Sequence, residues 1–224
     1  MSNLALTTLG CQLTAAPGIR YRTLCVRSSN RIARVPSLSN ARPMEFFCYH
    51  RDRPGSTQLR HQLVEQHWSY MDQFAATMIA RGPTFTSDGT LTGSVHIVGL
   101  PDPGAARSFA FEEPGFQAGA YRDVMLRRWH NSLGRTMWDF GGGRPDDRYL
   151  VLGFTSEPAA DATELPFRDE LIACGPLVSD DGSLVLGAAI LLEAPDADRA
   201  REVLSADRFA GIEVHQWRFG GRPT

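Results

Sequence analysis

Lysine is missing from this chain of 224 residues, so all 23 basic residues are arginine. We attribute this bias to a GC-rich, bacterial type of coding and not to a binding function, because nucleic-acid sites usually mix lysine with arginine. Acidic residues are missing from positions 1–43, which carry six arginines. The other 181 residues carry 17 arginines and 25 acidic residues, a formal balance of −8. This acidic body argues against nucleic acid or an anionic membrane as a partner.

Long apolar runs are also missing. No run approaches the roughly 20 residues that a membrane-spanning helix needs, which excludes a transmembrane segment of that kind. Hydrophobic residues make up 42% and charged residues 21% of the chain, as in ordinary globular proteins. The length allows one medium domain or two small ones. The sequence therefore predicts a soluble globular protein.

Cysteine is scarce and shows no pairing. Cys11, Cys25, Cys48 and Cys174 form no CxxC motif or metal-binding spacing, which favours buried thiols in a reducing compartment and a cytoplasmic location. The histidines have no HExxH-like spacing, so no metal site is predicted. A phosphate loop, a nucleophile elbow and a dinucleotide fingerprint are all absent, so no cofactor is predicted. The six histidines stand at positions 50, 61, 67, 96, 130 and 215.

The acid-free segment 1–43 has two interpretations. Its Arg/Ser/Thr-rich composition is typical of a transit peptide. Alternatively it precedes the natural start of the protein, since Met44 opens the first convincing strand. We favour the second interpretation because the remaining chain has a bacterial composition. In either case we predict no fold for this non-native or disordered extension.

One stretch of the chain occurs twice, at residues 80–107 and again at residues 173–201. Gly-Pro, Asp-Gly, Pro-Asp and Ala-Arg pairs recur in the same order, at an offset of 93 that becomes 94 after one inserted residue. Two such units suggest a duplicated small domain. The recurring pairs are Gly82-Pro83 and Gly175-Pro176, Asp88-Gly89 and Asp181-Gly182, Pro101-Asp102 and Pro195-Asp196, Ala106-Arg107 and Ala200-Arg201.

The first unit, residues 44–130, shows alternating strand and helix patterns. We expect a strand from Met44, a long helix from Ser56 or Thr57 to about Ala80 that Gly82-Pro83 ends, and a short strand before the Asp88-Gly89 turn. A strand over 93–99, a helix from about 101 that Glu113-Pro114-Gly115 stops, and a strand over 121–129 follow. This β-α-β-β-α-β order is that of a ferredoxin-like split βαβ unit.

The second unit, residues 148–220, follows a Gly-rich linker at 131–147. We expect strands over 148–154, 184–193 and 211–218, with helices from about Pro166 to Cys174 and over 196–205. This unit has no histidine near position 160, where the counterpart of His67 would fall. It is therefore a degenerate copy with at most an incomplete site.

With these residues in hand, the chain resembles the YCII-related proteins of the dimeric α+β barrel superfamily. The resemblance implies an α+β fold in which the two ferredoxin-like units pack sheet to sheet as a barrel, an intrachain pseudo-dimer, with a homodimer as the alternative. The first unit carries the resemblance through Glu65-Gln-His67, Gly82-Pro83, Asp88-Gly89, Gly93-Ser94, Glu113-Pro114-Gly-Phe116, Ala118-Gly119 and Trp129. The second carries it through Gly175-Pro176, Asp181-Gly182, Gly187, Asp207, Phe209-Ala210-Gly211 and Trp217.

The resemblance also implies a site. The family is described as having a histidine–aspartate pair in a pocket, and a few members resemble enzymes that act on small hydroxylated aromatic compounds. His67, in the middle of an apolar helical stripe, matches the histidine. Glu113 replaces the family aspartate, while the second unit keeps an acid, Asp207, without a histidine. A histidine beside a carboxylate in an apolar pocket can act as a general base. The alternative is a core histidine that makes one structural hydrogen bond.

Five further residues form the predicted ligand-binding set: His50, Arg51, Tyr70, Asp88 and Phe116. His50 and Arg51 end the first strand and could reach the same pocket, or they form an exposed strand end. Tyr70 lies one helical turn after His67 and lines either the pocket or the core. Asp88 is either a turn residue, since Asp-Gly before a strand is typical of turns, or a ligand contact.

Two functional hypotheses follow. In the first, the protein is a cofactor-independent enzyme of lyase or isomerase type, with His67 as base and Glu113 as the acid that orients it. In the second, it is a non-catalytic protein whose pocket only holds a small ligand. The geometry of the acid around His67 distinguishes them, because catalysis needs the pair in an open cavity.

Overall fold

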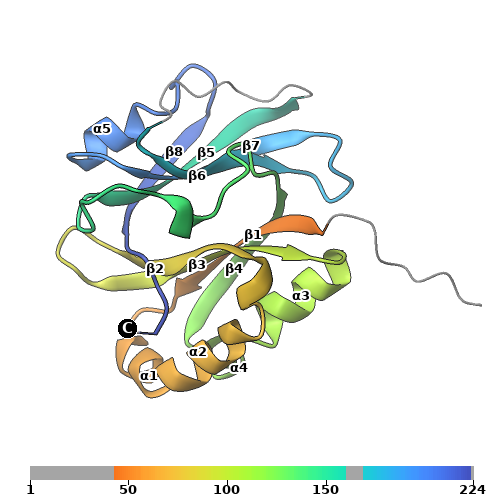
Figure 1. The fold of residues 1–224 in the computed structure, drawn as a ribbon, viewed down its shortest axis with the longest axis vertical. Coiled ribbons are helices and arrows are strands. Elements are labelled where there is room, and N and C mark those ends of the chain that lie inside the picture. The colour runs from red at the N-terminus through yellow and green to blue at the C-terminus, as the bar shows by residue number, and fades with distance from the viewer. Residues whose placement is uncertain (1–42, 160–168, 223–224) are drawn as a thin grey trace, which may run out of the picture. The chain divides into compact units, whose positions relative to one another are not determined.

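The computed structural model describes residues 43–159 and 169–222. Within these ranges, eight β-strands close into one barrel in the order β1-β3-β2-β8-β5-β7-β6-β4 (Figure 1). The protein is thus of the α+β class, with antiparallel pairing throughout the barrel. The strands are β1 (Met44–Asp52), β2 (Met78–Phe85), β3 (Leu91–Leu100), β4 (Tyr121–Trp129), β5 (Arg148–Ala159), β6 (Leu171–Val178), β7 (Val185–Glu193) and β8 (Gly211–Trp217).

The barrel consists of two four-stranded halves with the same strand order. The first half (residues 44–129) runs β4-β1-β3-β2, and the second half (residues 148–217) runs β8-β5-β7-β6. The halves meet at two short seams, where β2 pairs with β8 and β4 pairs with β6. Barrel closure therefore occurs within a single chain. The paired residues of the seams are Thr84↔Trp217, Phe85↔Gln216, Arg128↔Val178 and Trp129↔Leu177.

Strand alternation separates the interior of the barrel from the layer beneath the helices. In β1, Phe47 and Tyr49 belong to the interior cluster, while Phe46 and Cys48 belong to a cluster with helical residues. In β3, Val95 and Ile97 likewise lie inside, as the period-2 pattern predicts. The interior cluster combines both halves, so the sheet face that each half would otherwise expose is buried against the other.

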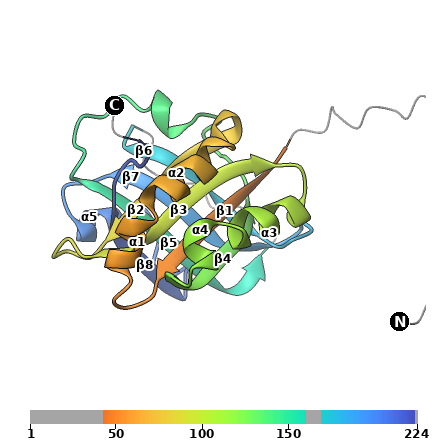
Figure 2. The same ribbon diagram turned by 90° about the horizontal axis from the view of Figure 1, so that it is seen from below.

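Helices cover the outer face of the first half (Figures 1 and 2). The helices of this half are α1 (Thr57–Gln62), α2 (Val64–Asp72), the 3₁₀ helix η1 (Ala75–Thr77), α3 (Pro103–Phe111) and α4 (Pro114–Gln117). The described part of the second half has α5 (Ala197–Arg201) on its outer side. The repeated Pro-Asp pair caps α3 and α5 in the same way. The Asp102 carboxylate accepts the Ala105 N–H, and that of Asp196 accepts the Arg199 N–H, both at 2.8 Å.

The repeated Gly-Pro pair lies inside strands and ends no helix, contrary to the sequence prediction. Gly82 is in β2 and Gly175 is in β6. A Cβ at Gly82 would stand 1.8 Å from the carbonyl oxygen of Arg218, and one at Gly175 would stand 1.7 Å from that of His130. Each glycine is therefore the point where the chain leaving the other half crosses the strand. Only a residue without a Cβ fits there.

The predicted long helix is also shorter than expected. Leu63 interrupts it between α1 and α2, and the chain enters β2 at Met78 instead of continuing to Ala80. Met78 and Ala80 are apolar because they are buried in the sheet. In the sequence, the same apolar character resembles a continuation of the buried helix face. Glu113-Pro114 does not stop α3, which ends at Phe111. It begins α4, where Glu113 is the N-cap.

In the second half, β7 and β8 agree with the predicted strands, and α5 is shorter than the predicted helix. The predicted helix from Pro166 falls partly outside the described residues. Its predicted end at Cys174 is wrong, because Leu171–Val178 is strand β6 and is buried from both sides. The predicted linker contains the 3₁₀ helix η2 (Met137–Asp139). In the described ranges, no helix combines the length and apolarity that a membrane crossing requires.

Candidate active site

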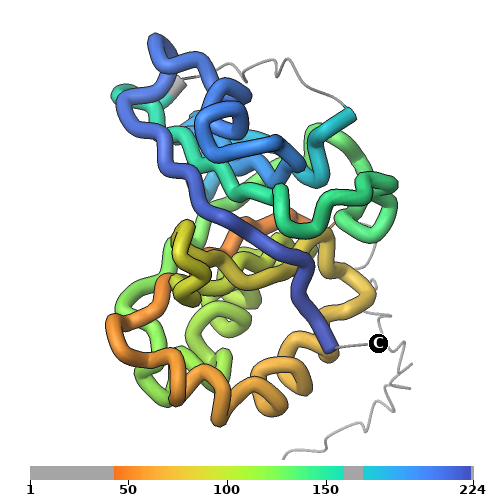
Figure 3. Tube along the Cα trace, turned by 90° about the vertical axis from the view of Figure 1, so that its left-hand side faces the viewer, coloured from red at the N-terminus to blue at the C-terminus, as the bar shows by residue number. Residues whose placement is uncertain are grey.

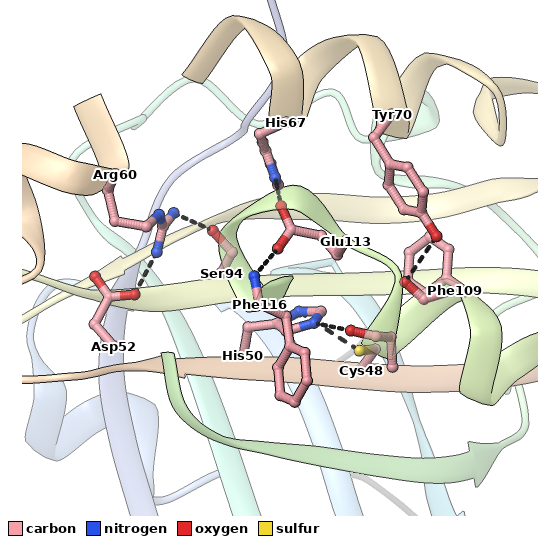
Figure 4. A network of polar contacts seen from close by, with 11 residues as sticks. Cys48, His50, Asp52, Arg60, His67, Tyr70, Ser94, Phe109, Glu113 and Phe116 are labelled. Atoms are coloured by element: carbon pink, nitrogen blue, oxygen red, sulfur yellow. Dashed lines mark hydrogen bonds and ion pairs between the residues drawn. The ribbon is translucent and has the colours of Figure 1, made fainter. Parts of the chain in front are cut away.

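The predicted pair of His67 and Glu113 is in direct contact. His67 Nδ1 lies 2.8 Å from Oε1 of Glu113, and the second carboxylate oxygen accepts the Phe116 N–H at 2.7 Å (Figure 4). Helix α2 supplies the histidine, and the N-cap position of α4 supplies the acid. The Glu113 side chain is fully buried, whereas the His67 side chain keeps 17% of its surface exposed. The carboxylate is thus fixed behind the ring and the ring reaches solvent.

The Glu113 carboxylate is ionised in this position. Burial by itself would raise its pKa, but the hydrogen bond and charge of His67, together with His50 and a backbone N–H, outweigh burial and lower the pKa. An ionised carboxylate can only accept, so the ring nitrogen that faces Glu113, Nδ1, is the one that donates the hydrogen bond to it. Nε2 then holds the free lone pair, which is the arrangement of a general base.

His67 borders a cavity of about 250 Å³ between α1, α2 and the outer face of β2 and β3. Apolar surface and convergent polar groups line it together, which is typical of small-molecule sites. Residues of the chain after β8 form part of its wall. The lining residues used below are Arg60, His67, Trp68, Ser94, His96 and Phe219.

Arg60 of α1 is held in place at one side of the cavity. Its guanidinium forms an ion pair with Asp52, donates to Ser94 Oγ at 2.7 Å and lies 4.8 Å above the Tyr121 ring centroid. These contacts use the guanidinium on three sides, and the Asp52 side chain is almost entirely buried. The result is a rigid positive group at the cavity rim, suited to an oxygen-rich ligand.

His96 and His50 lie beneath the cavity on the helix-facing side of the sheet. Burial, together with the charges of His67 and other neighbours, lowers the pKa of His96 well below its ordinary value. Burial lowers the pKa of His50 to about 4. Both rings are therefore neutral near pH 7. The His96 ring centroid is 5.4 Å from that of His67, and its buried Nδ1 has no hydrogen-bond partner among the described residues.

The other predicted ligand residues have different positions. His50 is fully buried, donates from Nε2 to the Ala110 carbonyl at 2.8 Å and contacts Phe116 and the Cys48 thiol, so it supports the floor of the site from below. Tyr70 donates to the Phe109 carbonyl at 3.1 Å and packs against the helical core. In Figure 4, His50 lies below the His67–Glu113 pair and Tyr70 lies to one side of it.

Arg51 and Asp88 lie away from this cavity. Arg51 pairs with Asp123 at 2.6 Å and borders a different hollow, next to Tyr49 and His215. Asp88 is exposed in the β2–β3 turn, where it accepts the Thr90 N–H at 3.0 Å and Gly89 has φ +83°. Asp88 therefore has the geometry of a turn residue, which is the alternative to a ligand contact.

The lining residues that the sequence does not indicate include Arg60, Trp68, Ser94 and His96. Arg60 lies in α1, before Leu63, and Trp68 lies in α2, after it. Ser94 and His96 alternate with the interior residues of β3. The period-2 pattern did place His96 on the face opposite Val95. The pattern does not indicate which element packs on that face. Within the described ranges, no cluster of three His, Cys, Asp or Glu side chains is arranged to hold a metal.

The family model of the YCII-related domain matches residues 44–130. Residues 44–130 are therefore similar to a YCII-related domain. The first half of the barrel carries the matched residues, which include His67 and Glu113. No curated protein matches the chain.

Two solved structures are similar to this chain. A 5-chloro-2-hydroxyhydroquinone dehydrochlorinase from Burkholderia phenoliruptrix AC1100, in complex with 2,5-dihydroxybenzoquinone, is 30% identical. The match covers 41% of this chain and 99% of that one, with a TM-score of 0.38. An anthrone oxidase-like protein is 9% identical, with coverage of 81% and 92% and a TM-score of 0.43.

Proposed function

We propose that this protein is a cofactor-independent enzyme of lyase or isomerase type that acts on a small hydroxylated aromatic compound. The observation that supports it is the contact of a solvent-reaching His67 with a fully buried, ionised Glu113 at the edge of a cavity of about 250 Å³. A core histidine with one structural hydrogen bond would not need an open side. General-base catalysis by such a pair typically contributes about 10²- to 10⁴-fold.

The proposed chemistry begins with proton transfer. His67 Nε2 takes the proton of a ring hydroxyl, and Glu113 stabilises the imidazolium that forms. The electron pair left on the ligand oxygen moves into the ring. A ring carbon then takes up a proton and becomes tetrahedral, and this keto tautomer is the product of an isomerase. In a lyase, that carbon bears the leaving group. A second ring hydroxyl then loses its proton, its electron pair moves into the ring, and the leaving group departs with its bonding electrons to give a quinone. In this proposal, polar residues that line the cavity, Ser94, His96 and Arg60, contact the remaining oxygens of the ligand.

We also propose that the second half is a diverged copy of the first. The repeated sequence pairs, the shared strand order and the crossing glycines at Gly82 and Gly175 support a duplication. Asp207, the acid of the second unit, is exposed and accepts a hydrogen bond from Ser205. One complete site per chain follows from this proposal.

The experiment compares the protein with a His67→Ala variant on hydroxylated and chlorohydroxylated benzenes, the class of compound for which the 30% identical dehydrochlorinase is named. We expect turnover by the native protein and a loss of about 10²- to 10⁴-fold in kcat for the variant, with ligand affinity changed much less. Equal turnover by both proteins would refute the catalytic role of His67. Binding without turnover in the native protein would favour the alternative, a non-catalytic ligand-binding protein.

A further inference from the structure

The segment that follows β8, residues 218–222 (the C-terminal segment), lies along β2 at the mouth of the His67 cavity. It leaves the second half and ends beside the orange to gold helical region of the first half (Figure 3). The Arg218 N–H donates to the Pro83 carbonyl at 3.2 Å, and the Gly220 N–H donates to the Arg81 carbonyl at 2.9 Å. The segment therefore extends the β2–β8 seam beyond the end of β8.

Arg222 fixes the end of this segment to α2. Its guanidinium donates to Glu65 at 2.8 Å, to Ser69 at 3.1 Å and to Asp72 at 2.9 Å, and it lies 5.6 Å above the Trp68 ring centroid. Residues Glu65, Trp68, Ser69 and Asp72 belong to the helix that carries His67. The second half is thus tied across the cavity to the helix of the catalytic histidine.

The sequence Phe219-Gly220-Gly221 allows this close course. A Cβ at Gly220 would stand 2.7 Å from Gly82 Cα, and Gly221 has φ +135°, a conformation that residues with side chains rarely adopt. Phe219 is held between the Trp217 ring, at 5.3 Å, and the Arg148 guanidinium, 3.8 Å from its centroid. All three residues of this sequence line the cavity.

We infer that the C-terminal segment is a specificity-determining wall of the His67 cavity, which admits one substituted aromatic ring and excludes fused-ring ligands. Phe219 contributes an aromatic side chain to this wall, and its ring is anchored against Trp217 and the interior cluster of the barrel. The volume agrees with it, because a cavity of about 150 Å³ holds benzene, whereas pockets for drug-sized ligands begin at about 300 Å³. At about 250 Å³, this cavity has room for a ring with a few oxygens. The inference rests on the proposed site and not on its chemistry.

Trp68 provides the readout, since it lines the cavity. Trp129 and Trp217 are fully buried and Trp138 is 52% exposed, so a Trp138→Phe background leaves Trp68 as the partly exposed tryptophan. In this background, binding of hydroquinone and of 1,4-dihydroxynaphthalene is followed by Trp68 fluorescence. The variants are Phe219→Ala and Arg222→Ala. Arg127→Ala, an exposed arginine on β4, is the matched control.

We expect the parent to bind hydroquinone and to discriminate against the naphthalene diol. Phe219→Ala should raise the ratio of bicyclic to monocyclic affinity at least tenfold, Arg222→Ala should raise it less, and Arg127→Ala should leave it unchanged. A ratio that is the same in all four folded proteins would overturn the inference. Glu113→Gln, at a buried residue outside the cavity lining, should lower turnover and keep the ratio, which separates a failure of the wall from a failure of the catalytic proposal.

A second measurement needs no ligand. Collisional quenching of Trp68 by acrylamide should increase about twofold or more in Phe219→Ala, because the wall shields the cavity in the native protein. If the parent binds neither diol, the proposed ligand class is wrong. Acrylamide quenching alone then tests whether the C-terminal segment shields the cavity. Unchanged quenching in both wall variants, with melting temperatures equal to that of the control, would refute it.

Discussion

The two halves of the barrel have the same strands and differ in the face that lies under their helices. In the first half, Cys48 pairs with His96 in the sheet. At the matching position in the second half, Val151 pairs with Ile190. His50 of β1 corresponds in register to Gly153 of β5, where a Cβ would stand 2.5 Å from Leu204. The polar floor of the first half is an apolar floor in the second, and apolar side chains pack directly on it.

This difference separates what the barrel needs from what the site needs. Both halves keep the crossing glycine, the capping aspartate and the closing tryptophan, since barrel closure requires them twice. Among the described residues, a histidine in contact with a fully buried acid occurs in the first half, and the sequence contains no histidine between His130 and His215. The second half contributes a wall in our proposal. The strand order is shared by both halves, and the proposed site lies in the first.

The largest expected effect concerns the element that the halves share. Gly82→Ala and Gly175→Ala should each lower the free energy of unfolding by at least about 3 kcal/mol, because the new methyl group overlaps a backbone carbonyl that cannot rotate away. Urea unfolding of each variant measures this. Gly143→Ala, whose Cβ would have nothing within 4 Å, is the control. If one of the two glycines tolerated alanine, the crossings would not be equivalent.

The second prediction isolates the buried histidines of the first half. The pKa of His50 is about 4 in the native protein and ordinarily 6.5, so the unfolded chain takes up a proton in a pH range where the folded protein does not. Stability should therefore be lost as pH falls from about 6.5 to about 4, by up to about 3 kcal/mol for this residue. Denaturant unfolding at a series of pH values should show a shallower loss for His50→Gln. The exposed His130→Gln should behave like the native protein, and an unchanged slope in His50→Gln would contradict the assignment.

The third prediction compares the two acids. Glu113→Gln should lower kcat by about 10- to 100-fold, because an amide can no longer stabilise the His67 imidazolium. Asp207→Asn, the corresponding change in the second half, should leave kcat within about twofold, since this carboxylate is exposed. Steady-state kinetics at equal melting temperature checks both. Equal losses in the two variants would argue against a single site per chain.

The smallest effect is expected in the two turns. Hydrogen bonds from Thr86 and Thr90 lower the pKa of Asp88 to about 2, and bonds from Ser179 and Ser183 lower that of Asp181 to about 2. Asp88→Ala and Asp181→Ala should lower the melting temperature slightly and equally, without changing ligand affinity. A fall in affinity for Asp88→Ala alone would restore its predicted role as a ligand residue.

Local patterns were sufficient for part of the fold. β4 begins and ends where the sequence predicts, and the alternation of β3 places Val95 and His96 on opposite faces as observed. The pair of His67 and Glu113 came from the family resemblance, and the two side chains do meet, although 46 residues separate them. Propensity alone would not have joined them.

The remainder depended on contacts between distant segments. Gly-Pro has the composition of a helix end, and only the carbonyl of Arg218 or His130 across the strand explains the glycine. The end of the long helix was placed too late because burial under a helix and burial within a sheet select the same residues at Met78 and Ala80. The sequence does not indicate the wall either, because nothing in Phe219-Gly220-Gly221 shows that this segment lies beside α2.

The shortness of the two seams has a consequence for how the barrel forms. Each seam joins the halves through two residue pairs and two further backbone hydrogen bonds, while strands within a half are paired along most of their length. In hydrogen exchange, the amides beside Thr84 and Trp129 should therefore open before those of the central strands. Folding should run in the reverse order, with each half assembling from nearby segments and the seams joining last. Because the C-terminal segment continues one of these seams, the cavity reaches its final shape only at the last step of folding.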